Sequence, residues 1–169
     1  MSCTTLTQGR ALSCSDTVGG LDYIEFADYS TIGNPTFDAT DTDVITTFDG
    51  TPTWYKYDLA STQNTFVENV TSDDDAGTTY FEQVLTLSLK KLDIASHKEL
   101  KLLAYGRPHV RITDRNGNSF IAGLKKGMKV TGGSFQTGGA LSDFQGYNLT
   151  LTGHERMPAN FLSGAAKPS

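Results

Sequence analysis

The feature that most constrains the fold is a run of alternating side chains at residues 80–89. Apolar residues occupy one side of a two-residue period and polar residues the other: Phe81, Leu85, Leu87 and Leu89 against Glu82, Thr86 and Ser88. This alternation is typical of a β-strand with one buried face. At about 3.3 Å per residue the run spans roughly 33 Å, which exceeds the usual strand length. We therefore expect the strand to run the whole height of a sheet.

A short helix is predicted directly after this strand. Ser96 and Glu99 have the spacing of a capping box, in which the serine hydroxyl accepts a hydrogen bond from the amide of Glu99. The sequence predicts a flanking α-helix that begins at Ser96 and ends at Tyr105, because Gly106 and Pro108 stop it. A helix this short needs to lie against a sheet to be stable.

The helix is followed by four predicted strands, at residues 109–113, 119–122, 128–135 and 147–152. Asn116-Gly117 joins the first two, since both residues tolerate the positive φ angles of a tight hairpin turn.

Before residue 80 the sequence predicts strands at residues 21–29, 43–48, 53–57 and 65–70. Asp49-Gly50 is a hairpin signal, so we expect the strands at 43–48 and 53–57 to pair. The polar segment 71–77 predicts a turn that joins the strand at 65–70 to the long strand.

Length and composition favour one mainly β domain with one helix. A chain of 169 residues forms a sufficient core as a single domain, and its 37% hydrophobic content with many Thr, Gly and Asp residues fits two-faced sheets and loops. Residues 1–20 lack periodicity and predict an extended N-terminal arm, either a floppy end or a segment that orders on a neighbouring subunit. We expect one domain over residues 21–162 and a flexible C-terminal tail over residues 163–169.

The N-terminal sequence predicts neither a secretion signal nor a membrane span. It has no positive region followed by an apolar run, and no stretch of about eighteen apolar residues occurs in the chain. We therefore expect a protein that stays soluble in the cytoplasm. Cys3 and Cys14 match neither a zinc nor a redox motif, and two free thiols are favoured over a local disulfide.

Charge is divided unevenly along the chain. Residues 1–80 contain thirteen acidic residues against Arg10 and Lys56, a net charge of −11, whereas residues 81–169 contain six acidic and twelve basic residues, a net charge of +6. This pattern has two interpretations: the acidic residues occupy solvated loops, or an acidic surface of one copy meets a basic surface of the next. The acidic balance argues against tight binding to nucleic-acid phosphates.

No catalytic, cofactor-binding or metal-binding residues are predicted, and we do not expect an enzyme. His97, His109 and His154 lack metal-ligand spacing, so we expect each at the surface or at a helix start. The segment 132–139 lacks the Gly-Lys-Ser/Thr ending of a phosphate loop. Calcium is a minor alternative, because neither Asp73-Asp74-Asp75 nor the pair Asp41 and Asp43 matches a twelve-residue calcium loop.

The aromatic residues at 54–57 allow two interpretations. Trp54, Tyr55 and Tyr57 would offer a stacking platform for a carbohydrate or a base if they were exposed together. A core strand or a subunit interface explains the same residues, and we favour this second interpretation.

The order of these elements carries a resemblance. The long strand at 80–89, the helix at 96–105, the Asn116-Gly117 hairpin and the closing segment 138–147 before Leu149 and Leu151 resemble the conserved half of bacteriophage tail tube proteins. This fold is shared with type VI secretion tubes and tail terminator proteins.

The resemblance implies two packed antiparallel sheets, as a β-sandwich or barrel, with a flanking helix. It also implies hexameric rings whose inner strands continue into a β-barrel around a lumen, and which stack into the tube that carries DNA out of the capsid. The chain would then be a structural virion protein, the major tail tube subunit, made in the host cytoplasm and located in the phage tail. Its partners would be further copies of itself and other tail or neck proteins, and DNA would pass without specific binding.

Two alternatives remain beside this expectation. A head–tail connector or tail terminator ring would cap a tube rather than extend it. A monomeric β-sandwich module would bind a ligand such as a glycan through Trp54 and Tyr57. Self-assembly suits the residues themselves, because closing subunits into a shared barrel removes exposed strand edges. An acidic, Lys-poor lumen would repel DNA phosphates, if some of the Asp residues face inward.

Overall fold

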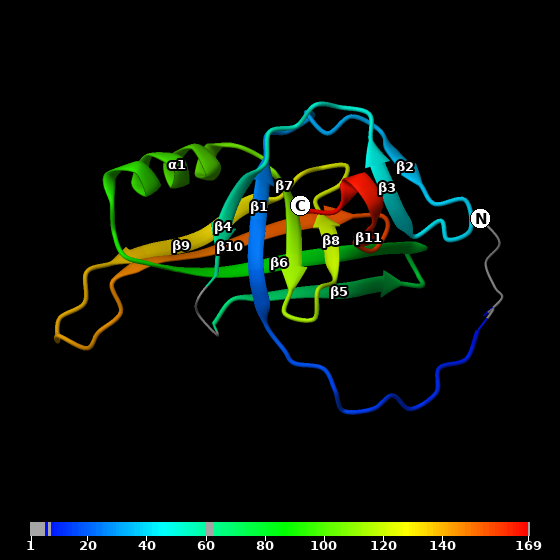
Figure 1. Cartoon of the computed structure of the whole chain (residues 1–169), viewed down its shortest axis with the longest axis horizontal. Coiled ribbons are helices and arrows are strands. Elements are labelled where there is room, and N and C mark those ends of the chain that lie inside the picture. Colours follow the sequence, from blue (N-terminus) through cyan, green and yellow to red (C-terminus); the bar gives the residue numbers. More distant parts are fainter. Residues whose placement is uncertain (1–5, 7, 60–62, 169) are drawn as a thin grey trace.

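A computed structural model describes residues 6, 8–59 and 63–168. Over this part of the chain, strands form two sheets that pack face to face (Figure 1). The larger sheet has the order β2 (Pro35–Phe37), β3 (Val44–Phe48), β11 (Asn160–Leu162), β8 (Ser119–Ala122), β7 (His109–Asp114), β1 (Leu21–Ala27) and β4 (Tyr55–Asp58). The smaller sheet has the order β5 (Thr65–Asp73), β6 (Thr78–Lys90), β10 (Gly146–Glu155) and β9 (Lys129–Gln136). One α-helix, α1 (Ile94–Tyr105), and one 3-10 turn, η1 (Gly164–Ala166), complete the described elements.

The expected fold class is therefore confirmed: mainly β, with two packed sheets and one short helix. Paired strands run antiparallel except β3 and β11, which are parallel. The two sheets make a sandwich, and neither closes into a barrel within the described residues.

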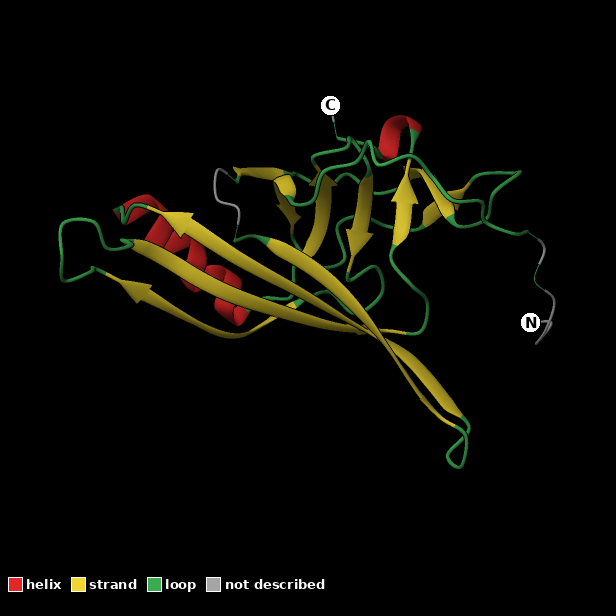
Figure 2. Ribbon diagram, turned by 90° about the horizontal axis from the view of Figure 1, so that it is seen from below, coloured by secondary structure: helices red, strands yellow, loops and turns green. Residues whose placement is uncertain are grey.

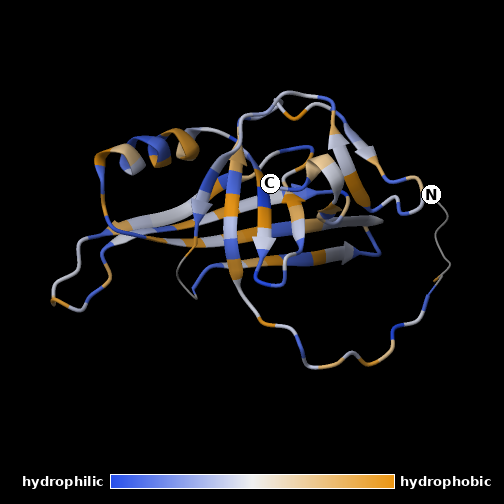
Figure 3. Cartoon of the chain, viewed as in Figure 1, coloured by the Kyte–Doolittle hydropathy of each residue, from blue (hydrophilic) through white to orange (hydrophobic). Residues whose placement is uncertain are grey.

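The predicted long strand is β6, which has 13 residues and is the longest strand described. It pairs with β5 across the polar turn, as expected, and with β10 over residues 81–90. Leu87 lies opposite Leu149 and Leu85 opposite Leu151, so one face of this sheet is apolar. The alternation is visible along the strands in Figure 3.

The core lies between the apolar face of the four-stranded sheet and β1 and β7 of the larger sheet. Fully buried side chains from both layers meet there: Ile24, Val110 and Ile112 from one, Leu85, Leu87 and Leu151 from the other. Burying a side chain of this kind contributes about 1.5–3 kcal/mol. The helix α1 covers another part of the same face, because the His97 ring contacts those of Phe135 and Tyr147.

The helix begins two residues earlier than predicted, and its N-cap is Asp93 rather than Ser96. The Ser96 amide and hydroxyl both donate to the Asp93 carboxylate, at 2.7 and 2.8 Å. These hydrogen bonds lower the pKa of Asp93. Aspartate caps a helix as well as serine does, and the earlier cap adds helical residues. The end at Tyr105 is confirmed, with the Gly106 amide donating to the Leu102 carbonyl at 3.0 Å.

The predicted pairing between residues 43–48 and 53–57 is wrong. The strand β3 lies between β2 and β11, whereas β4 pairs with β1 at the edge of the sheet. The Asp49-Gly50 signal instead extends the β2–β3 pairing, since the Gly50 amide donates to the Ile32 carbonyl at 3.1 Å. The strand β3 therefore pairs with the distant β11 rather than with β4, the next strand along the chain. The predicted hairpin between β7 and β8 does occur. The last two predicted strands also form, as β9 and β10, and they pair with each other.

The two ends of the chain differ in how they are held. The arm runs outward from the body along a wide arc (Figure 1), with Leu12 fully exposed. It is anchored near its end, where the Asn116 side chain bonds both the amide and the carbonyl of Val18, at 3.0 and 2.8 Å. A flexible tail is expected from residue 163, but Ala166 in η1 is only 1% exposed. The tail is thus held against the larger sheet at Ala166.

Candidate assembly surface

The four-stranded sheet has two outer edges, β5 and β9, that pair with no strand among the described residues. Each strand of this sheet runs antiparallel to its neighbour. Counting across the four strands, β5 and β9 therefore run in opposite directions. An unpaired edge presents backbone N–H and C=O groups to a further strand.

The face of this sheet that points away from the core is polar. Its cross-strand pairs are Glu82 with His154, Val84 with Thr152, Thr86 with Thr150 and Ser88 with Asn148. The His154 and Glu82 side chains form a partly exposed ion pair at 3.5 Å. The seven-stranded sheet lies on the opposite side of these strands (Figure 2), so this face is left to solvent or to a partner.

The hairpin of β5 and β6 extends beyond the body of the protein. Figure 2 shows its tip projecting away from the seven-stranded sheet, and the side chain of Val70 is 63% exposed. The Ala76 amide donates to the Asp73 carboxylate at 3.1 Å, so this carboxylate closes the turn. No group of three or more potential metal ligands comes together in the described part of the chain, Asp73-Asp74-Asp75 included.

Three exposed lysines gather where β9 begins: Lys125, Lys126 and Lys129, which we name the basic corner. The amides of Lys125 and Lys126 donate to the buried Glu155 carboxylate, at 2.9 and 2.8 Å. These bonds fix the backbone of the loop and leave the ammonium groups outside. The basic corner is therefore held in place at one end of an open edge.

Gln83 links the two layers at this end, and sequence analysis missed it. Its amide nitrogen donates to Glu68 on β5 at 2.9 Å, and its oxygen accepts a bond from the Gly123 amide at 2.8 Å. Glu68 also accepts the Ala159 amide at 2.9 Å. Gln83 shares the two-residue period of Phe81 and Leu85, and that position was the available signal for a buried polar side chain.

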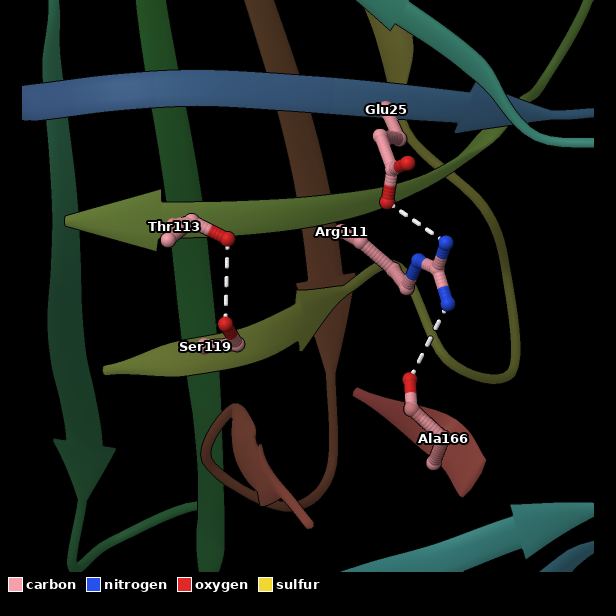
Figure 4. Close-up of polar contacts among 5 residues, drawn as sticks. All are labelled: Glu25, Arg111, Thr113, Ser119 and Ala166. Carbon is pink, nitrogen blue, oxygen red and sulfur yellow. Dashed lines mark hydrogen bonds and ion pairs between the residues drawn. The ribbon is translucent and has the colours of Figure 1, made fainter. Parts of the chain in front are cut away.

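Arg111 organises the second face of the larger sheet (Figure 4). Its guanidinium contacts Glu25 at 2.6 Å, donates to the Ala166 carbonyl at 3.1 Å and lies 4.0 Å from the Trp54 ring centroid. Both charged side chains are about nine-tenths buried. Burial lowers the pKa of Arg111, and the charge of Glu25 opposes that shift. This cluster joins β1, β7, η1 and the residue directly before β4.

Trp54 and Tyr57 do not form one platform. Trp54 packs against Arg111 on the second face, whereas Tyr57 packs edge-on against Phe26, in the core between the sheets, at 5.2 Å between centroids. Burial also raises the pKa of Tyr57. Both residues serve the core, which is the interpretation that we favour from sequence.

The predicted surface position is wrong for His109, which is 2% exposed on β7. Its Nδ1 bonds the Gly123 carbonyl at 2.7 Å and its Nε2 accepts the Ser30 amide at 3.1 Å. These partners require the neutral ring with the proton on Nδ1. Burial lowers the pKa of His109. His97 and His154 are exposed, as expected.

Two pockets open at the surface of the described part of the protein. One, of about 460 Å³, lies between Tyr55 on β4 and Leu102 on α1. The other, of about 490 Å³, lies between Tyr80 and Met157 beside the basic corner. Cys14 is an exposed free thiol, and Cys3 lies outside the described residues, so the expectation about their pairing stays a prediction.

No protein-family model, curated protein or solved structure matches the chain. The resemblance to tail tube proteins therefore rests on the residues and their order. In the described part of the chain, no helix combines the length and apolar character needed to cross a membrane.

Proposed function

We propose that this chain is a structural, non-enzymatic protein, the repeating subunit of a hollow ring that stacks into a bacteriophage tail tube. One observation carries the proposal: the four-stranded sheet ends in two open edges of opposite direction. When β9 of one copy meets β5 of the next, the strands are antiparallel, as they are throughout the sheet. The same joint repeats at every copy.

Such a joint is heterologous, so it either closes into a ring or grows without limit. Closure removes both open edges at once. The resemblance implies six copies. Six four-stranded sheets, with strands about 4.8 Å apart and tilted as in known barrels, give a shared barrel roughly 40–50 Å across. That width is sufficient for a DNA duplex.

The bulk of the subunit decides which face lines the channel. The seven-stranded sheet and α1 occupy one face, so only the polar face fits inside. Its strands present mainly Thr, Ser and Asn side chains, with the acidic Asp73 and Glu82 balanced by the basic Lys90 and Lys129. The sequence predicts an acidic lining, but the lining that we propose is nearly neutral. The reason is that most acidic residues of the first half of the chain lie in the larger sheet and its loops. A lining without a basic cluster lets DNA phosphates slide.

The same features of the sheet bear on the two alternative functions, a connector or terminator ring and a monomeric binding module. A connector or terminator ring shares the joint and differs only in stacking. A monomeric glycan-binding module loses its platform, because Trp54, directly before β4, and Tyr57, on β4, lie on opposite faces of the larger sheet. Localisation in the virion tail, and contacts with other tail or neck proteins, follow from the tube proposal.

The test is imaging of the purified protein by negative-stain electron microscopy, with light scattering after size-exclusion chromatography. We expect rings and stacked tubes with a central channel. Isolated rings that never stack would indicate a connector or terminator. A monomer that persists at high concentration would overturn the proposal.

A further inference from the structure

The two open edges have matching lengths, with nine residues in β5 and eight in β9. An antiparallel joint with aligned ends places Thr65 of one copy opposite Gln136 of the next. Side chains that face the core must stay on that face across the joint, because a slip of one residue turns every side chain over.

The aligned register satisfies this condition. On β5, Phe66 faces the core opposite Leu85; on β9, Phe135 faces the core opposite Tyr147. The alignment sets Phe66 beside Phe135 of the neighbour. The register of β9 shifts at a bulge between its pairs with Thr150 and Leu151. Because of this shift, Val130 of one copy would lie beside Val70 of the next. Phe135 and Val70 are 61% and 63% exposed in the single chain, so both would gain an apolar neighbour.

The same register brings opposite charges together. Asp73 is the last residue of β5, and Asp74 and Asp75 begin the turn after it; we name these three residues the acidic turn. The basic corner lies just before and at the start of β9. All six side chains are exposed, and none of them forms an ion pair within the described chain. The β5–β6 turn of the neighbouring copy would then contact residues 125–127.

We propose that β5 and β9 join neighbouring copies in this register, and that the acidic turn of one copy docks on the basic corner of the next. The inference rests on the proposed ring and names the contact that sets its register. Charge pairs at the rim of an interface act mainly on partner choice and association rate. A slipped register would lose them and bury polar residues.

Charge reversal tests the contact. Asp74→Lys with Asp75→Lys spares Asp73, whose carboxylate closes the turn. Lys125→Glu with Lys126→Glu spares the loop, which is held through backbone amides. We expect each variant to raise the concentration needed for assembly at least tenfold, and an equimolar mixture to restore it through alternating copies. Lys98→Glu with Lys101→Glu, on the exposed side of α1, is the matched control and should assemble normally.

Cysteine crosslinking tests the register. With Cys3→Ser and Cys14→Ser in place, Val67→Cys and Ser134→Cys would be directly opposite across the joint, at a Cβ distance of about 4.5–5.5 Å. Within one chain the two positions are separated sideways by three strand spacings, roughly 14 Å, and are also offset along the strands, so any crosslink joins two copies. We expect a ladder of oligomers, and none from Thr71→Cys with Ser134→Cys.

The outcomes separate the two proposals. If the unmodified chain forms rings, but charge reversal has no effect and only the second cysteine pair crosslinks, the register is wrong and the ring stands. If the unmodified chain stays monomeric, the ring itself is refuted.

Discussion

The two sheets differ in how much of their surface the chain itself covers. The inner strand β7 of the larger sheet is buried on both faces, by the core on one side and by Trp54 and η1 around Arg111 on the other. The four-stranded sheet is covered on one face and open at both edges. The larger sheet also ends in two edge strands, β2 and β4, but these have only three and four residues. The smaller sheet leaves a whole face and two longer edges that a neighbour would complete.

This difference follows from where the polar residues lie. In the larger sheet, buried polar side chains have partners inside the chain: Arg111 has Glu25, and Thr113 bonds Ser119 at 3.0 Å (Figure 4). In the smaller sheet, most of the polar face is a row of Thr and Asn side chains that water can reach, whereas the Ser88 hydroxyl on the same face is buried. The first arrangement stabilises a monomer, and the second tolerates a wet channel.

The largest expected effect comes from breaking the closed face of the larger sheet. Arg111→Ala leaves Glu25 buried without its counter-charge, which should cost about 3–5 kcal/mol of unfolding free energy. Chemical denaturation measures it. Arg111→Met combined with Glu25→Gln removes both charges and should recover most of the loss. A cost below about 1 kcal/mol for the single change would mean that this face is not closed by the pair.

The next effect compares the two faces of the four-stranded sheet. Leu85→Ala removes a fully buried side chain and should cost about 2–5 kcal/mol. Thr86→Val, on the opposite face, keeps the branched shape and should stay within about 0.5 kcal/mol. Denaturation of both variants under monomeric conditions gives the contrast. Equal losses would show that both faces are packed.

A smaller effect concerns the pH dependence of the larger sheet. The folded protein holds His109 neutral, so its pKa lies below the usual 6.5. As the pH falls below that value, the unfolded chain binds a proton that the folded chain does not, and stability decreases toward the folded pKa. One proton adds a slope of at most about 1.4 kcal/mol per pH unit.

His109→Gln should remove this component from a plot of unfolding free energy against pH, while His97→Gln, at an exposed position, should leave it. An identical slope in His109→Gln would assign the acid sensitivity to other groups.

The smallest effect locates the start of the helix that covers part of the four-stranded sheet. Asp93→Ala removes the side chain that accepts both Ser96 bonds, and should lower the melting temperature by roughly 2–4 °C. Ser96→Ala keeps the bond from the amide and should have less effect. If Ser96→Ala lowered the melting temperature more than Asp93→Ala, Ser96 would be the N-cap.

Sequence reasoning found the strands that local patterns encode and missed contacts that distant segments make. The long strand, the Asn116-Gly117 hairpin and the helix end at Tyr105 depend on side-chain period and turn conformation, which neighbouring residues determine. The basic corner was visible only as lysines in a basic half of the chain. Its place beside an open edge needed the order of strands in the sheet.

The sequence by itself determined that this protein is mainly β, with a long one-faced strand and a helix after it, because periodicity and capping act over a few residues. Only the tertiary structure decided that β3 pairs with β11 at the far end of the chain, that His109 is buried, and that β5 and β9 are left as the edges of the smaller sheet. Those outcomes depend on burying one whole surface against another, and no short stretch of residues carries that information.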